Sequence, residues 1–215
     1  MSDFYALDVA LIPVDHPVPT EANRILLKGH PLGFPFDADH LPHITLLQQY
    51  MSSAALPSLT RNLATALARA GFPQRYGQMT VTGLSRSPGE APRLVLGDDD
   101  GRLQQLHEAV LQACLPFREA VPASAESQAF ADRPGDRACA YVRGFAEEQG
   151  GAAFRPHLTL GIGPGGLLRD LEEKTTFPFT LDTARLVVAR LGPHCTVSRE
   201  IHAEFTVAGN AGDPD

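Results

Sequence analysis

Apolar residues recur along this chain with two periods, one typical of strands and one typical of helices. Runs or alternations of apolar residues predict strands at 4–14, 41–50, 75–85, 92–97, 138–145, 154–162, 177–191 and 197–208. Apolar residues spaced by three or four predict helices at 18–29, between Ser53 and Gly71, at 101–113 and at 166–174. The spacing is clearest between Ser53 and Gly71, where leucines form the apolar face and glycine ends the helix.

The order of these elements predicts an α+β fold in a single bilobal domain, residues 1–208, followed by a disordered tail at 209–215. Strand-helix-strand units occur in 1–113 and again in 138–208. The connection between them, 114–137, is rich in Pro, Ala, Ser and Asp. We therefore expect two pseudo-symmetric lobes, each an antiparallel-rich sheet with helices on the outside, and an active-site cleft between them.

Two short segments repeat the same order of residues, Pro42-His43-Ile44-Thr45-Leu46 and Pro156-His157-Leu158-Thr159-Leu160. Strand side chains alternate between faces, so each His and the Thr two positions later project from the same face. The apolar residue between them then points into a core. Proline lacks a ladder N–H and is confined to strand starts and edges, so both histidines should lie near the beginning of their strands.

These residue types suit phosphate ester chemistry. Histidine titrates near neutrality, so one imidazole can act as a base while the other acts as an acid. The two threonines can donate hydrogen bonds to phosphate oxygens that gain charge. A single copy is equally compatible with a buried strand carrying an incidental histidine. The second copy, in the same order, favours a shared site.

The pair of segments resembles the 2H phosphoesterase superfamily, which includes LigT-type RNA 2′,3′-cyclic phosphodiesterases, often labelled 2′-5′ RNA ligases. PHITLL and PHLTLG carry the resemblance, which covers most of the chain in element order. It implies that His43 and His157 are catalytic, one activating water and the other protonating the leaving sugar oxygen. It also implies that Thr45 and Thr159 hold the phosphate, without a metal or cofactor. Which histidine has which role stays open, and the long 114–137 stretch leaves the substrate open.

The composition restricts the kinds of molecule that the protein can bind and the compartment in which it works. The chain has 215 residues, a formal net charge of −7 and three cysteines. The negative charge disfavours extended nonspecific nucleic-acid binding but allows a pocket for an RNA end or a small nucleotide. An odd number of scattered cysteines indicates a reducing, cytoplasmic setting. No apolar run is long enough for a membrane span, and the N-terminus lacks the basic region of a signal peptide. A bilobal monomer would hold a complete site.

Other residues near the two segments are candidates for substrate contacts. Arg155 and Phe154 precede the second segment, and Tyr50 follows the first strand, so these three are predicted to bind phosphate or stack on a base. A solvated Arg at a strand entry explains Arg155 equally well. The turn Gly192-Pro193 is flanked by Arg190, His194 and Arg199, and a hairpin there either overhangs the site or is an ordinary turn.

Three further patterns have ordinary explanations. His40, close to His43, Asp37 and Asp39, suggests a metal site, but this spacing on an extended chain does not place two imidazoles on one face. The acidic run Asp98–Asp100 suits a helix cap better than a Mg²⁺ site. The glycine-rich segment 161–166 lacks the Lys-Ser/Thr of a phosphate loop and is interpreted as a turn. The remaining histidines interpreted as surface or structural residues are His16, His30, His107 and His202.

The sequence therefore predicts a metal-independent phosphodiesterase that hydrolyses a cyclic phosphate, either a 2′,3′-cyclic RNA end or a small cyclic nucleotide, with 2′-5′ RNA ligation as an accompanying activity. The first alternative is a protein that binds a nucleotide or RNA end without turnover. The second is a metal-dependent hydrolase that uses His40 and His43.

Overall fold

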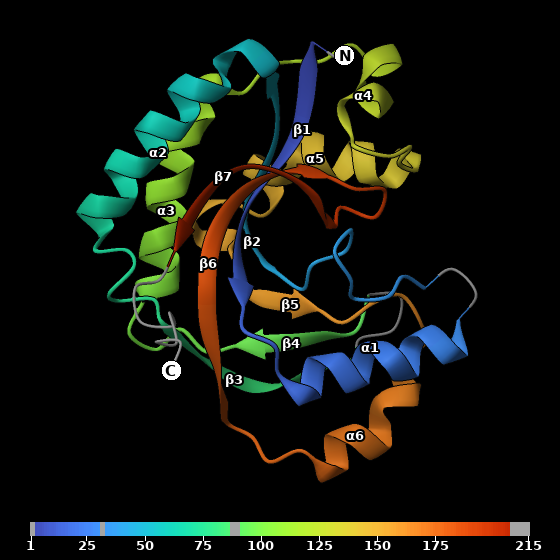
Figure 1. Ribbon diagram of the computed structural model, residues 1–215. Helices are drawn as coiled ribbons and strands as arrows, with labels where there is room; N and C mark the ends of the chain where they lie inside the picture. The colour runs from blue at the N-terminus through green and yellow to red at the C-terminus, as the bar shows by residue number, and fades with distance from the viewer. Residues whose placement is uncertain (1–2, 31–32, 87–90, 207–215) are drawn as a thin grey trace, which may run out of the picture.

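A curled antiparallel sheet forms the centre of the protein (Figure 1), whose computed structural model describes residues 3–30, 33–86 and 91–206. Its strands are β1 (Phe4–Pro13), β2 (Ile44–Ser52), β3 (Gln78–Ser85), β4 (Arg93–Leu96), β5 (His157–Thr159), β6 (Phe179–Leu191) and β7 (Val197–Thr206). They are ordered β2-β1-β6-β3-β4-β5, and β7 pairs with β6 beside this path. The two strands that follow the prolines, β2 and β5, therefore lie at the two ends of the order.

The long strand β6 carries the sheet around its bend. Its first residues, from Phe179 to Asp182, pair with β3, and its later residues, from Thr183 to Arg190, pair with β1. Register shifts interrupt its pairing with both β1 and β7. Bulges of this kind bend a strand and increase its twist. As a result the sheet curls and β2 contacts β5, although five steps of strand pairing separate them.

Helices cover the sheet from several sides (Figure 1). They are α1 (Pro17–Gly29), α2 (Leu56–Ala70), α3 (Arg102–Cys114), α4 (Ala123–Ala129), α5 (Asp136–Glu148) and α6 (Arg169–Lys174). Short 3₁₀ turns occupy Ser53–Ala55, Leu115–Phe117, Gly151–Ala153 and Gly165–Leu168. Helices α2 and α3 lie side by side, and α3 and α5 both contact β2. Strand β2 is consequently held from more than one direction.

The α+β fold class is confirmed, and so are several local predictions. The leucine face of α2 is buried at Leu59, Leu63 and Leu67, and Gly71 ends that helix with a left-handed φ of 80°. The Asp98 carboxylate accepts hydrogen bonds from the backbone N–H groups of Leu103 and Gln104, at 2.7 and 2.8 Å, and so caps α3. The predicted tail, 209–215, lies outside the described residues.

One predicted strand is wrong. Residues 138–145 belong to helix α5, which buries Cys139, Val142 and Phe145 at three-residue spacing. This run is short and apolar, and at that length a buried strand and one face of a helix have the same composition. The predicted connection 114–137 is also more regular than expected, because it contains α4.

The second motif strand is shorter than predicted. It keeps only His157–Thr159 of the expected 154–162, because Pro156 lacks an N–H and Gly161 and Gly163 take φ values of 136° and 156°. The start of α2 also differs, since the 3₁₀ turn at 53–55 precedes it.

Candidate active site

Both repeated segments open onto one cavity of about 440 Å³. His43, Thr45, His157 and Thr159 all line it. The apolar residues between them, Ile44 and Leu158, are fully buried on the opposite side. The predicted alternation is therefore confirmed for both segments. The proline argument is confirmed as well, because β2 starts directly after His43 and β5 starts at His157.

The two imidazoles are oriented by the same local contact. His43 Nδ1 lies 2.8 Å from the Leu41 carbonyl oxygen, and His157 Nδ1 lies 2.8 Å from the Arg155 carbonyl oxygen. A carbonyl oxygen only accepts, so Nδ1 carries the proton in both rings. Each neutral ring then has its lone pair on Nε2, the nitrogen that takes up or releases a proton. The carbonyl two residues upstream of each histidine sets this tautomer.

A buried carboxyl group lies next to the first histidine. Asp8 on β1 accepts hydrogen bonds from Thr45 Oγ1 at 3.2 Å and from Gln48 Nε2 at 2.8 Å, both through Oδ2. His43 Nε2 is 3.6 Å from the same oxygen. Burial raises the pKa of Asp8 to about 7, against hydrogen bonds that lower it, and burial lowers the pKa of His43.

The sequence reasoning missed Asp8 and Gln48. Asp8 was visible only as the single charged residue in an otherwise apolar strand, which is a signal for a buried functional carboxyl group. Gln48 is three positions after Thr45 and would point to the other face of a regular strand. A register shift between Val9 and Ala10 against β2 restores both residues to one face.

The rest of the cavity wall is partly aromatic. Phe34 and Phe36 come from the loop before β2, and Tyr141 comes from α5. Among the described lining residues, Arg137 is the only arginine or lysine. The turn between β6 and β7 also lines the cavity, through Pro193–Thr196. Of the two interpretations of that turn, the structure favours an overhanging hairpin.

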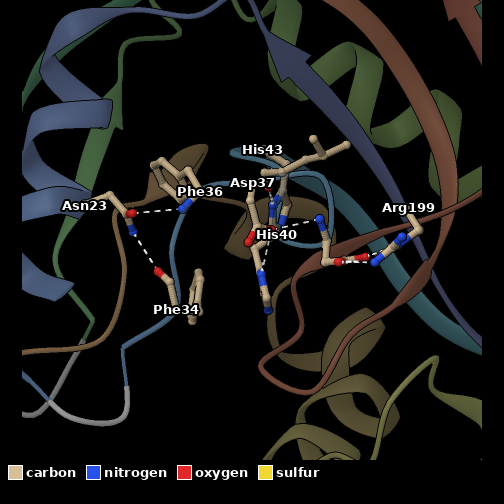
Figure 2. Close-up of polar contacts among 9 residues, drawn as sticks. Asn23, Phe34, Phe36, Asp37, His40, His43 and Arg199 are labelled. Atoms are coloured by element: carbon tan, nitrogen blue, oxygen red, sulfur yellow. Dashed lines mark hydrogen bonds and ion pairs between the residues drawn. The ribbon is translucent and has the colours of Figure 1, made fainter.

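The loop that leads into His43 is held at several points, as Figure 2 shows. Asn23 on α1 donates to the Phe34 carbonyl at 3.1 Å and accepts from the Phe36 N–H at 2.9 Å. Its amide also donates to the Leu160 carbonyl at 2.9 Å, at the end of the second repeated segment. Further along the loop, Arg199 forms an ion pair with Asp39. Asn23 thus ties the loop before the first motif to the end of the second motif.

His107 on α3 makes a second bridge between the two motif regions. Its Nδ1 donates to the Leu46 carbonyl of β2 at 2.7 Å, and its Nε2 accepts the Gly151 N–H at 3.0 Å, just before the second motif. The ring is fully buried and stacks on Phe154 with centroids 4.1 Å apart. His107 is therefore a structural residue, as interpreted from the sequence.

A family profile described as the 2′-5′ RNA ligase superfamily matches residues 17–193. The chain belongs to the 2′-5′ RNA ligase superfamily. This confirms the resemblance to 2H phosphoesterases, a superfamily of phosphoesterases and ligases. No curated protein matches the chain.

In this superfamily member, the three predicted substrate contacts do not line the cavity. Tyr50 is buried and donates through its hydroxyl to the Cys139 carbonyl at 3.3 Å, and Phe154 is buried against His107. Arg155 is exposed and donates to the carbonyls of Ala152 and Phe154 at 2.9 and 2.7 Å. Core packing and local backbone bonds therefore account for all three, and Phe34, Phe36, Tyr141 and Arg137 occupy the wall instead.

The other chemical patterns also have local partners. His40 Nδ1 bonds to Asp37 Oδ1 at 2.9 Å, and its ring stacks on Phe34. No group of three or more potential metal ligands occurs among the described residues. A larger hollow of about 630 Å³ lies between α2 and α3 and contains neither motif. Within the described part of the chain, no helix combines the length and apolarity needed to cross a membrane.

Proposed function

We propose that this protein is a metal-independent phosphodiesterase that hydrolyses a cyclic phosphate by paired histidine acid–base catalysis. The observation that supports it most is the shared cavity, into which two imidazoles with the same Nδ1–H tautomer open, each beside a threonine. In-line displacement at phosphorus needs a base behind the attacking oxygen and an acid at the leaving oxygen. Two histidines from opposite ends of the curled sheet meet that requirement.

The site chemistry follows from these positions. One histidine takes a proton from water as the water oxygen bonds to phosphorus. The other gives a proton to the ribose oxygen as its bond to phosphorus breaks. Thr159 stabilises the phosphate oxygens, and Thr45 does so once its hydroxyl turns from Asp8 Oδ2 towards the substrate. When a ribose hydroxyl replaces water as the nucleophile, the same groups join two ends through a 2′-5′ linkage. All four groups come from one chain, so we propose that residues 1–208 act as a monomer.

The cavity walls favour a small substrate or a chain end. A volume of about 440 Å³ suits roughly one nucleotide, and Phe34, Phe36 and Tyr141 provide aromatic surfaces for a base. One arginine, Arg137, is available for a phosphate. We propose a 2′,3′-cyclic RNA end or a small cyclic nucleotide as substrate, encountered in the cytoplasm.

A substrate panel tests this function. Nucleoside 2′,3′-cyclic phosphates, short RNAs with 2′,3′-cyclic ends, cyclic dinucleotides and 2′-5′ oligoadenylates are incubated with the protein, and products are identified by mass spectrometry. We expect hydrolysis of a 2′,3′-cyclic phosphate, undiminished by EDTA. Binding without product would favour the nucleotide-binding alternative. Loss of activity in EDTA with recovery on metal addition would favour a metal-dependent hydrolase.

A further inference from the structure

Asp8 lowers the stability of this fold, because its carboxyl group is buried. It is the only charged side chain in β1 and is fully buried. Oδ2 accepts two hydrogen bonds, whereas Oδ1 has no hydrogen-bond partner among the described residues. A buried carboxyl group with an unpaired oxygen destabilises a protein, and an apolar residue would fill this strand position at lower cost. Its position beside the cavity suggests a role there.

A proton held by Asp8 or His43 makes the contact between them favourable. His43 already donates its Nδ1–H to the Leu41 carbonyl, so a neutral ring presents only a lone pair at Nε2. That atom is 3.6 Å from Asp8 Oδ2. A carboxylate facing a neutral imidazole would bring two acceptors together. One proton shared by the pair removes this conflict and leaves the buried pair with no net charge.

The titratable groups that surround Asp8 in the described structure do not compete for the proton that it shares with His43. Two titratable side chains interact electrostatically with Asp8, Tyr141 on α5 and Cys195 in the β6–β7 turn. Burial raises the pKa of each to about 12, so both are neutral near pH 7. On β2 the neighbours of Asp8 are Thr45 and Gln48, and its register partner on β6 is Ala189. None of these three neighbours carries a charge.

We propose that Asp8 is a positioning residue that keeps a proton on the first motif, so that His43 is the general acid and His157 the general base. This inference rests on the proposed function. Water loses a proton to His157 Nε2 as its oxygen bonds to phosphorus. The bond from phosphorus to one ribose oxygen breaks, and that oxygen takes the proton from His43 Nε2. Exchange with solvent then returns a proton to the Asp8–His43 pair and removes one from His157.

The decisive experiment compares two leaving groups. A ribose alkoxide must be protonated as it leaves, whereas 4-nitrophenolate leaves without an acid. The substrates are uridine 2′,3′-cyclic phosphate and bis(4-nitrophenyl) phosphate. For Asp8→Asn we expect kcat on the cyclic phosphate to fall about 10²-fold with KM little changed, and kcat on the aryl ester to stay within a few fold. His43→Gln should show the same selectivity, and His157→Gln should slow both substrates.

The matched control is Asp182→Asn, the same chemical change on β6 at an exposed position outside the cavity. It should leave both activities unchanged. Equal loss on both substrates in Asp8→Asn would indicate a structural role and overturn the proposal, and so would no loss on either.

The pH dependence of kcat should shift in opposite directions in two variants, Asp8→Asn and Gln48→Met. Burial lowers the pKa of His43. Asp8→Asn removes the carboxylate with which His43 shares a proton, so we expect the alkaline limb of kcat to move to lower pH in this variant. Gln48→Met removes a hydrogen bond that lowers the pKa of Asp8, so in that variant the limb should move to higher pH. Unmoved limbs in both variants would contradict the shared proton.

Nitrogen-15 NMR of the histidine rings separates this proposal from the proposed function, because it needs no turnover. In the free protein, His43 Nε2 should be protonated or strongly hydrogen-bonded near pH 7, and Asp8→Asn should abolish that signature. Identical His43 titrations in both proteins would overturn the role of Asp8 even in an active enzyme. A normal signature in a protein that turns over no phosphodiester would overturn the proposed function alone.

Discussion

The two repeated segments have the same order of residues but different surroundings. Strand β2 has nine residues and contacts β1, α3 and α5, whereas β5 has three and pairs with β4. Both histidines bond through Nδ1 to a carbonyl two residues upstream. The strand paired with β2 is β1, which carries Asp8. The strand paired with β5 is β4 (Arg93–Leu96), which contains no acidic residue. The repeat therefore specifies two similar geometries, and the neighbouring strands make them chemically unequal.

The largest expected effect comes from removing either imidazole. His43→Ala and His157→Ala should each lower kcat on a cyclic phosphate by about 10²–10⁴-fold, because each removes one proton-transfer step. Circular dichroism and melting curves should match the wild type, since both rings lie at the cavity. Full activity in either variant would contradict a two-histidine mechanism.

The second prediction concerns the pH dependence of stability that Asp8, beside the first motif, gives to the protein. Burial raises the pKa of Asp8 from 3.8 to about 7, so the folded protein keeps a proton that the unfolded chain loses. The free energy of unfolding should therefore fall as pH rises from about 4 to 7, by as much as about 4 kcal/mol. Asp8→Asn should remove this slope, as measured by urea unfolding at several pH values.

His43 acts in the opposite sense, because its lowered pKa makes stability rise as pH increases towards 6.5. The difference between wild type and Asp8→Asn therefore reports the combined titration of the Asp8–His43 pair. Parallel pH dependences in the two proteins would show that Asp8 keeps an ordinary pKa.

The third prediction tests the link between the two regions. Asn23→Ala removes hydrogen bonds to the Phe34 and Leu160 carbonyls and to the Phe36 N–H, and leaves buried polar groups unpaired. We expect a loss of about 2–4 kcal/mol in the free energy of unfolding. Asn62→Ala, an exposed position on α2, is the matched control and should change stability by less than about 0.5 kcal/mol. Equal stabilities would exclude Asn23 as a structural bridge.

The smallest expected effect separates the two threonines. Thr45 donates its hydroxyl proton to Asp8, so Thr45→Val should mainly raise the pKa of that carboxyl and shift the alkaline limb of kcat upward. Thr159→Val should lower kcat about 10-fold or more without that shift. Matched pH profiles of the two variants decide the point, and equal losses without any shift would mean that the threonines are equivalent.

Local order was accessible from sequence wherever it depends on neighbouring residues. The leucine period of α2, the Asp98 cap and the position of each histidine at a strand start follow from side-chain spacing and from proline chemistry. Helix α5 could not be predicted from sequence, because an apolar run of eight residues fits a buried strand equally well until its packing partner is known. Phe154 and Tyr50 show the same limit, because adjacency to a motif in sequence does not decide whether a side chain faces the cavity, and both lie in the core.

The sequence by itself determined that two histidine-threonine pairs exist, that each pair shares one face of a strand and that each histidine lies near the start of its strand. Backbone alternation and the missing N–H of proline are local properties, so they can be recognised in a few residues. Only the tertiary structure decided that the two ends of the sheet meet, because this requires long-range pairing and bulges along β6. It also decided the state of Asp8, because a buried pKa depends on everything packed around the carboxyl group.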